Sequence, residues 1–130
     1  MIVVDASVLT TALVDDGDDG RRARDRLSGE HLSAPELIDL EVASVLRRLC
    51  AGGQLDPARA AQTLADLDAL RLERVPHRPL LSRCWELRQN ITVYDAAYVA
   101  LAEILDATLV TADQHLTSSP GARCTFELFE

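Results

Sequence analysis

Lysine is absent from the sequence, and all 13 basic residues are arginine. Proteins that hold nucleotide phosphates with a P-loop lysine are therefore excluded. The 13 arginines are outnumbered by 21 Asp and Glu residues, which gives a formal net charge of −8. This balance also excludes a protein that binds nucleic acid mainly through bulk positive charge. Any nucleic acid has to be bound at a local site.

Cysteine and targeting signals are scarce as well. The three cysteines, Cys50, Cys84 and Cys124, are too far apart for a C-x-x-C metal site and too few for a disulfide framework. We interpret them as buried, reduced thiols. The sequence has no basic leader, no small-residue cleavage site and no apolar run long enough to cross a membrane. We therefore expect a cytoplasmic protein without membrane contact.

Residues that interrupt regular structure are few, with only 6 Gly and 5 Pro among 130 residues. Together with 48% hydrophobic and 26% charged residues, this is the composition of a folded chain. The length suits one domain, and no repeat or linker interrupts it. We expect residues 1–130 to form a single domain.

Apolar segments of strand length alternate with segments of helical periodicity. The predicted strands cover residues 2–4, 31–34, 72–75, 108–111 and 124–129. The predicted helices cover residues 7–14, a polar segment around 21–26, and residues 35–51, 57–70, 79–88 and 93–105. Parallel strands need a crossover to return, so this alternation is typical of an α/β fold with a mostly parallel sheet.

Two acidic residues follow predicted strands directly. Asp5 ends the run Ile-Val-Val, and Asp113 comes just after the strand at 108–111. In open α/β sheets, ligands bind beyond the carboxyl ends of the strands, so both carboxylates are candidate site residues. The ordinary alternative is that each one caps the helix that follows.

Two further acids lie within predicted helices. Glu41 lies about 60° from the centre of the apolar stripe of helix 35–51, where a half-buried ion pair with Arg48 is the ordinary alternative. Asp95 follows Thr92 at the spacing of a capping box. Residues 96–102 are apolar nearly all round, which predicts an enclosed helix. A charged side chain at the buried start of this helix needs a compensating partner.

Convergence of these four acids would demand a cation or protonation. Each pair would repel by about 3 kcal/mol at about 5 Å with an effective dielectric near 20. Oxygen ligands without a nearby Cys or His pair suit Mg²⁺ or Mn²⁺ better than zinc. His31, His77 and His115 lack metal-ligand spacing, and we interpret them as surface or packing residues.

Four segments carry a family signature. They read MIVVDAS at residues 1–7, LEVASVLRR at 40–48, TVYDAAYVALAE at 92–103 and LVTAD at 109–113. In this succession they resemble the PIN-domain nucleases, and specifically the VapC-type toxins, over essentially the whole chain. The acidic positions of the family fall on Asp5, Glu41, Asp95 and Asp113.

The resemblance implies a PIN-like three-layer α/β/α sandwich with a central parallel five-stranded sheet. It also implies an endoribonuclease that needs one or two Mg²⁺ or Mn²⁺ ions, held by Asp5, Asp95 and Asp113. Glu41 would either ligate a metal ion or orient the water that attacks phosphorus in line. The sequence leaves these two roles open.

Further site groups and partners follow from the same resemblance. Thr111 and Ser7 fall on positions where hydroxyl groups support the site, although each could be an ordinary strand-end or first-turn hydroxyl. The implied partners are an RNA substrate, a cognate VapB-type antitoxin and a second copy in a homodimer. Operator DNA would be reached only through the antitoxin.

Arginines are the only basic groups that could contact RNA phosphates. Arg21, Arg22, Arg24 and Arg26 form a dense run, and Arg48 lies in the same helix as Glu41. A solvated helix face is the more ordinary explanation for such a run.

Other enzymes that use Asp and Mg²⁺ in α/β folds fit the sequence poorly. Receiver domains and haloacid-dehalogenase-type phosphatases normally require a lysine, and Asp5-Ala-Ser lacks the second Asp of the phosphatase motif. No G-x-S-x-G elbow supports a serine hydrolase. The remaining alternative is a catalytically silent PIN-like protein that acts through an antitoxin and operator complex.

Overall fold

Five short strands pair into one parallel sheet in the computed structural model, which describes all 130 residues. The strands are β1 (Ile2–Val4), β2 (Leu32–Pro35), β3 (Leu72–Val75), β4 (Thr108–Thr111) and β5 (Phe126–Leu128). Their order is β3-β2-β1-β4-β5, and every neighbouring pair is parallel. The predicted central parallel five-stranded sheet is confirmed.

Helices fill the connections between the strands. They are α1 (Ala6–Val14), α2 (Asp18–Leu27), α3 (Ile38–Ala51), α4 (Pro57–Ala69), the 3-10 turn η1 (Arg78–Leu80), α5 (Leu81–Glu86), α6 (Val93–Leu105) and α7 (Gln114–Thr117). None of them is long and apolar enough to cross a membrane. Asp56 caps α4 and Pro57 occupies its first turn, as the sequence indicated.

Two predicted helix boundaries were wrong. The helix predicted from Pro35 begins only at Ile38, because Pro35 still pairs with Val75 as the last residue of β2. The helix predicted over 79–88 is divided into η1 and the shorter α5. The predicted helices did not include α7, a four-residue helix that begins after Asp113, although the capping alternative for Asp113 implied a helix at this place.

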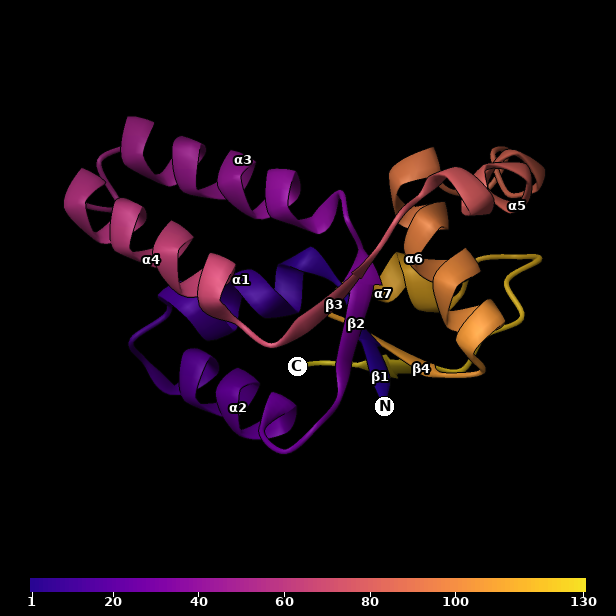
Figure 1. Ribbon diagram of the computed structural model, residues 1–130, viewed down its shortest axis with the longest axis horizontal. Helices are drawn as coiled ribbons and strands as arrows, with labels where there is room; N and C mark the ends of the chain where they lie inside the picture. Colours follow the sequence, from indigo (N-terminus) through magenta and orange to yellow (C-terminus); the bar gives the residue numbers. More distant parts are fainter.

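The helices cover both faces of the sheet and complete a three-layer sandwich. Helices α1 to α4 lie on one side of the strands, while α5 and α6 lie on the other (Figure 1). Helices α3 and α4 run antiparallel as a pair that extends away from the sheet (Figure 1). The two sides meet above the carboxyl ends of β1 and β4, where α3 and α6 approach each other.

Helix α6 is the most deeply enclosed helix. Seven consecutive residues, Ala96 to Ala102, are buried, as expected from their apolar character on all sides. The run contains four alanines, whose small side chains let the backbone of α6 lie close to β1, β2 and β4. This close packing fixes the position of Asp95, which directly precedes the buried run.

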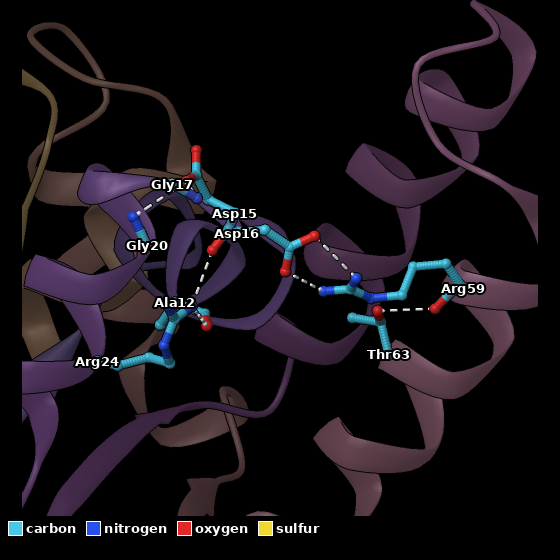
Figure 2. A network of polar contacts seen from close by, with 8 residues as sticks. All are labelled: Ala12, Asp15, Asp16, Gly17, Gly20, Arg24, Arg59 and Thr63. Atoms are coloured by element: carbon cyan, nitrogen blue, oxygen red, sulfur yellow. Dashed lines mark hydrogen bonds and ion pairs between the residues drawn. The ribbon is translucent and has the colours of Figure 1, made fainter.

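A network of hydrogen bonds stabilises the turn between α1 and α2 (Figure 2). Asp15 Oδ1 accepts hydrogen bonds from the amides of Gly17 at 2.7 Å and Gly20 at 3.1 Å. Arg24 Nη1 donates to the carbonyls of Ala12 at 3.1 Å and Asp15 at 2.8 Å. A Cβ on Gly20 would lie only 1.8 Å from the Asp15 carbonyl oxygen, so this turn requires glycine there.

The three cysteines are unpaired, as the sequence indicated. Only Cys84 is buried, whereas Cys50 and Cys124 are half-buried, so the expectation that all three are buried was wrong in part. Burial raises the pKa of the Cys84 thiol and, with Glu103 nearby, raises that of Cys124 to about 11. Both thiols therefore favour the protonated, less reactive form.

Candidate active site

Asp5 and Asp113 come together because β1 and β4 are neighbours. Val4 pairs with Val110, and the Asp5 amide donates to the Val110 carbonyl at 3.1 Å. The chain builds the sheet in one direction from β1 through β2 and β3, and then places β4 on the other side of β1. Such a reversal opens a crevice beyond the carboxyl ends of the strands, where α/β proteins bind ligands.

Neutral groups hold both oxygens of the Asp5 carboxylate. Oδ1 accepts hydrogen bonds from the Ser7 amide at 2.6 Å and from the Ser7 hydroxyl. Oδ2 accepts from the Thr111 hydroxyl at 2.6 Å, and Thr111 is completely buried. Asp5 thus caps α1, and the two hydroxyls expected to support the site both contact it. The capping interpretation and the site interpretation are compatible.

Asp113 has a similar double role. Its Oδ1 caps α7 by accepting from the amides of His115 at 2.9 Å and Leu116 at 3.4 Å. Its own amide donates to the Thr111 hydroxyl at 3.1 Å, so Thr111 links Asp113 to Asp5. The second carboxylate oxygen of Asp113 has no hydrogen bond within the protein and remains available.

Glu41 is fixed by a residue that sequence reasoning missed. The hydroxyl of Tyr98, on α6, donates to Glu41 Oε1 at 2.6 Å, and only 2% of the Tyr98 surface is exposed. Burial raises the pKa of the Glu41 carboxyl, and the charges of Asp5 and Asp95 raise it further against the opposing effect of Tyr98. The ion pair with Arg48, the ordinary alternative for Glu41, does not form, and Tyr98 is the hydrogen-bond partner of this carboxylate instead.

Asp95 carries the least compensated charge. The Thr92 hydroxyl accepts a hydrogen bond from the Asp95 amide at 3.1 Å, which is one half of the predicted capping box. The Asp95 carboxylate makes no return bond, and it is half-buried at the entrance to α6. Burial raises its pKa, and the charges of Asp5 and Asp113 add to this effect against the opposing effect of Thr92.

All four predicted acids line a single cavity of about 320 Å³, which we call the acidic cavity. The lining combines these carboxylates with hydroxyl groups, one arginine and a few apolar side chains. Its residues are Asp5, Ala6, Ser7, Glu41, Ser44, Val45, Arg48, Asp95, Tyr98 and Asp113. Residues from the end of β1 to the segment just after β4 thus converge on one cavity.

The donor chemistry of the acidic cavity fits a hard divalent cation. Carboxylate and hydroxyl oxygens line it, and no thiol or imidazole does. No three His, Cys, Asp or Glu side chains are grouped into a ready-made cage for a metal ion. Mg²⁺ usually keeps several waters and takes one or two carboxylates, so it does not require such a cage.

The arginines expected near RNA separate into two groups. Arg48 lines the acidic cavity. Arg21 and Arg22 pair with Asp18 and Asp19 on their own helix, and Arg24 bonds to carbonyls of the α1–α2 turn. Arg26 pairs with Glu127 and Glu30, so the whole α2 run lies outside the cavity lining.

Tyr98 and Ser44 are the polar cavity residues that the sequence interpretation missed. Tyr98 follows Asp95 by three residues and Ser44 follows Glu41 by three, so each lies on the same helix face as its acid. That spacing was the available signal. Tyr98 was hidden because it belongs to an apolar run that reads as core.

Two ribonucleases resemble the chain over nearly its whole length. The sequence profile of the PIN domain matches residues 2–120. Ribonuclease VapC9 of Mycobacterium tuberculosis is 44% identical over 124 residues, which cover 95% of this chain and 94% of that protein. Ribonuclease VapC1 of the same organism is 39% identical over 127 residues, covering 97% of this chain and 96% of that protein.

Solved structures share the fold at much lower identity. FitAcB from Neisseria gonorrhoeae aligns with a TM-score of 0.73 and 15% identity over 97% of this chain and 96% of that one. VapBC2 from Rickettsia felis, solved with a DNA fragment from its promoter, aligns with a TM-score of 0.69 and 16% identity over the whole of both chains. This likeness supports the three-layer sandwich independently of the sequence pattern.

Proposed function

Since the chain belongs to the PIN-domain family, and within it to the VapC ribonucleases, we propose that the acidic cavity hydrolyses phosphodiester bonds of RNA. The protein is a VapC-type endoribonuclease toxin. The observation that carries the assignment of the site is the convergence of Asp5, Glu41, Asp95 and Asp113 on one cavity of about 320 Å³. We propose that residues 1–130 act as one PIN domain.

Asp5, Asp95 and Asp113 would hold one or two Mg²⁺ or Mn²⁺ ions. A bound ion of this kind offsets negative charge on the phosphate and lowers the pKa of water. Asp95 and Asp113 each retain carboxylate oxygens without a hydrogen bond, which suits them to bind a cation directly or through water. Ser7 and Thr111 orient Asp5 through hydrogen bonds to both of its oxygens.

Glu41 is suited to accept the proton of the attacking water. Tyr98 occupies one of its oxygens and leaves the other without a hydrogen bond. Its raised pKa favours this role, because a general base works best when its pKa approaches the working pH. Arg48, which lines the same cavity, would contact a phosphate of the RNA.

We propose that the toxin is neutralised by a VapB-type antitoxin and contacts operator DNA only through it. This proposal is supported by a fold neighbour solved as a toxin–antitoxin complex from Klebsiella pneumoniae and by the VapBC2 assembly. We also propose a homodimer in the cytoplasm. An apolar cavity of about 300 Å³, lined by residues of α5 and α6 that include the exposed Trp85 and Tyr94, supports a contact with a second copy.

The test of the site is Asp5→Asn, with Asp25→Asn as the matched control on the exposed face of α2. We expect Asp5→Asn to lower Mn²⁺-dependent cleavage of total RNA by at least about a hundredfold, the effect of losing one preorganised charge. Asp25→Asn should cleave like the unsubstituted protein. Isothermal titration with Mn²⁺ should show stoichiometric uptake that Asp5→Asn weakens. Unchanged cleavage by Asp5→Asn would refute the site, and absence of any uptake or cleavage would favour the silent binding protein.

A further inference from the structure

A second cavity of about 430 Å³ adjoins the acidic cavity. It is lined by Arg88, Gln89, Asn90, Ile91, Thr92, Asp95, Asp113, His115 and Leu116. We propose that this second cavity binds the base of an RNA nucleotide next to the scissile phosphate and thereby sets the cleavage sequence. The inference rests on the proposed function, because it assigns a specificity subsite to that reaction.

The position of the second cavity follows from two shared residues. Asp95 and Asp113 line both cavities, so the two volumes meet at these carboxylates. A phosphate bound at the acidic cavity therefore has its neighbouring nucleotide at the mouth of the second cavity. The volume lies within the usual range of small-ligand sites, roughly 300–1,000 Å³.

Unused hydrogen-bonding groups give the second cavity the means to distinguish bases. The Gln89 side chain makes no hydrogen bond within the protein, so its amide can offer two donors and one acceptor oxygen. Asn90 Nδ2 donates to the Pro120 carbonyl at 3.0 Å, which fixes this side chain and leaves its carbonyl oxygen as an acceptor. The half-buried Ile91 supplies apolar surface for the body of a base, while the buried Leu116 packs behind the cavity wall.

Arg88 provides a positively charged rim. Its guanidinium carbon lies 4.4 Å from the centroid of the Trp85 ring, and its Nη1 donates to the Trp85 carbonyl at 2.8 Å. No carboxylate pairs with it, unlike Arg21, Arg59 and Arg83. A guanidinium held in place without a counter-ion can stack on a base or contact a phosphate.

Single-stranded RNA is the ligand that matches this combination. Proteins read unpaired bases by stacking them on planar groups and by hydrogen bonds to their edges, and both elements are present here. In a protein of net charge −8, Arg48 at the acidic cavity and Arg88 at the second cavity place positive charge along one path. Each of the two adjoining cavities therefore has one arginine available to the RNA strand.

The first experiment measures cleavage preference. A pool of single-stranded RNA with randomised positions is cut by the unsubstituted protein, Gln89→Ala and Gln62→Ala, and the product ends are sequenced. We expect Gln89→Ala to reduce the base preference beside the cut by roughly three- to tenfold, the value of one lost hydrogen bond. Gln62→Ala, on α4, should keep the preference. An unchanged preference in Gln89→Ala would overturn the proposal.

The second experiment does not depend on cleavage. Trp85 is the only tryptophan, so its fluorescence reports on Arg88 directly. Titration with uncleavable 2′-O-methyl hexanucleotides of each base should give saturable changes whose affinities differ between bases, and Arg88→Gln should weaken the tightest one roughly tenfold. The matched control is Arg71→Gln, an exposed arginine outside this cavity.

The two proposals fail in different ways. Base-dependent binding that Arg88→Gln weakens, in a protein that cleaves no RNA, would keep the subsite and refute the nuclease. Metal-dependent cleavage whose sequence preference survives both substitutions, with equal fluorescence responses to all four oligonucleotides, would refute the subsite and keep the nuclease.

Discussion

Carboxylates gather at two places in this protein, and the two groups are compensated in opposite ways. At the α1–α2 turn, Asp16 pairs with Arg59 of α4 through two contacts of 3.0 Å, and Arg24 braces the same turn (Figure 2). In the acidic cavity, the partners of the acids are backbone amides and the hydroxyls of Ser7, Thr111 and Tyr98.

The pKa values of the acids shift in opposite directions in the two groups. The hydrogen bond and charge of Arg59 lower the pKa of Asp16, whereas burial and mutual repulsion raise those of Glu41 and Asp95. A neutral hydroxyl orients a carboxylate without cancelling its charge. The turn therefore uses its acids to join helices, and the acidic cavity keeps its charge available for a cation.

The largest effect is expected from breaking the turn at Gly20. In Gly20→Ala the added Cβ would meet the Asp15 carbonyl oxygen at 1.8 Å, so the backbone of the turn has to shift. We expect a loss of about 2–3 kcal/mol in the free energy of unfolding, as for other overpacked sites. Urea denaturation measures this loss.

Gly17→Ala is the matched control in the same turn, because its Cβ would meet only the Asp15 side chain at 3.3 Å. It should cost less than about 1 kcal/mol. Equal losses in the two variants would contradict the close approach at Gly20.

A smaller effect is expected from removing one hydroxyl of the acidic cavity. Tyr98→Phe deletes the hydrogen bond to Glu41 while keeping the buried ring. We expect turnover or Mn²⁺ affinity to fall about tenfold, as for other groups that orient metal ligands. Because this bond lowers the pKa of Glu41, its loss should move the acidic limb of the pH–rate profile to higher pH.

Tyr94→Phe, an exposed position on the same helix, is the control for this effect and should leave cleavage and its pH profile unchanged. A Tyr98→Phe protein with an unaltered profile and unaltered Mn²⁺ uptake would show that Tyr98 only fills space.

The smallest effect is expected in the pH dependence of stability, which differs between the two groups of acids. The folded pKa of Asp95 is raised, so its contribution to stability is full below the unfolded pKa, near 3.9, and is lost as pH rises through the folded pKa. Without metal, Asp95→Asn should therefore gain stability relative to the unsubstituted protein between pH 4 and pH 7. Urea denaturation in EDTA at both pH values measures the difference.

Asp16→Asn should show the opposite sign in the same denaturation carried from pH 5 down to pH 3, because the folded pKa of Asp16 is lowered. The contribution of Asp16 to stability is present above its unfolded pKa and is lost as pH falls through the folded pKa. The same direction of change in both variants would contradict the contrast between the two groups.

Much of the fold could be predicted from sequence because its signals are local. The run Ile2–Val4, the capping residue Thr92 and the apolar positions of α6 each indicate their element without knowledge of neighbours. The errors arose where contact with a residue distant in the sequence determines the local structure. Pro35 remains in β2 because β3 lies beside it, and β3 is distant in the sequence.

The residues of the two cavities likewise include some that could be predicted from the sequence and some that could not. The four acids could be predicted because charges at buried strand and helix ends are conspicuous, and because the motifs around them carry a family resemblance. Tyr98 and Gln89 could not, since a tyrosine in an apolar run and a glutamine on a surface turn are ordinary in any protein. Only the folded structure shows that Tyr98 reaches Glu41 across from α6 to α3, and that Gln89 shares a cavity with residues of α7.

The hydrogen bond between Thr111 and Asp5 joins residues 106 positions apart. A chain that stops before β4, through incomplete synthesis or proteolysis, carries Asp5, Glu41 and Asp95 but lacks the strand that brings Asp113 beside them. Thr111 and Asp113 lie in and just after β4, so the hydroxyl that orients Asp5 and the fourth carboxylate of the acidic cavity are both supplied only once this strand has joined the sheet.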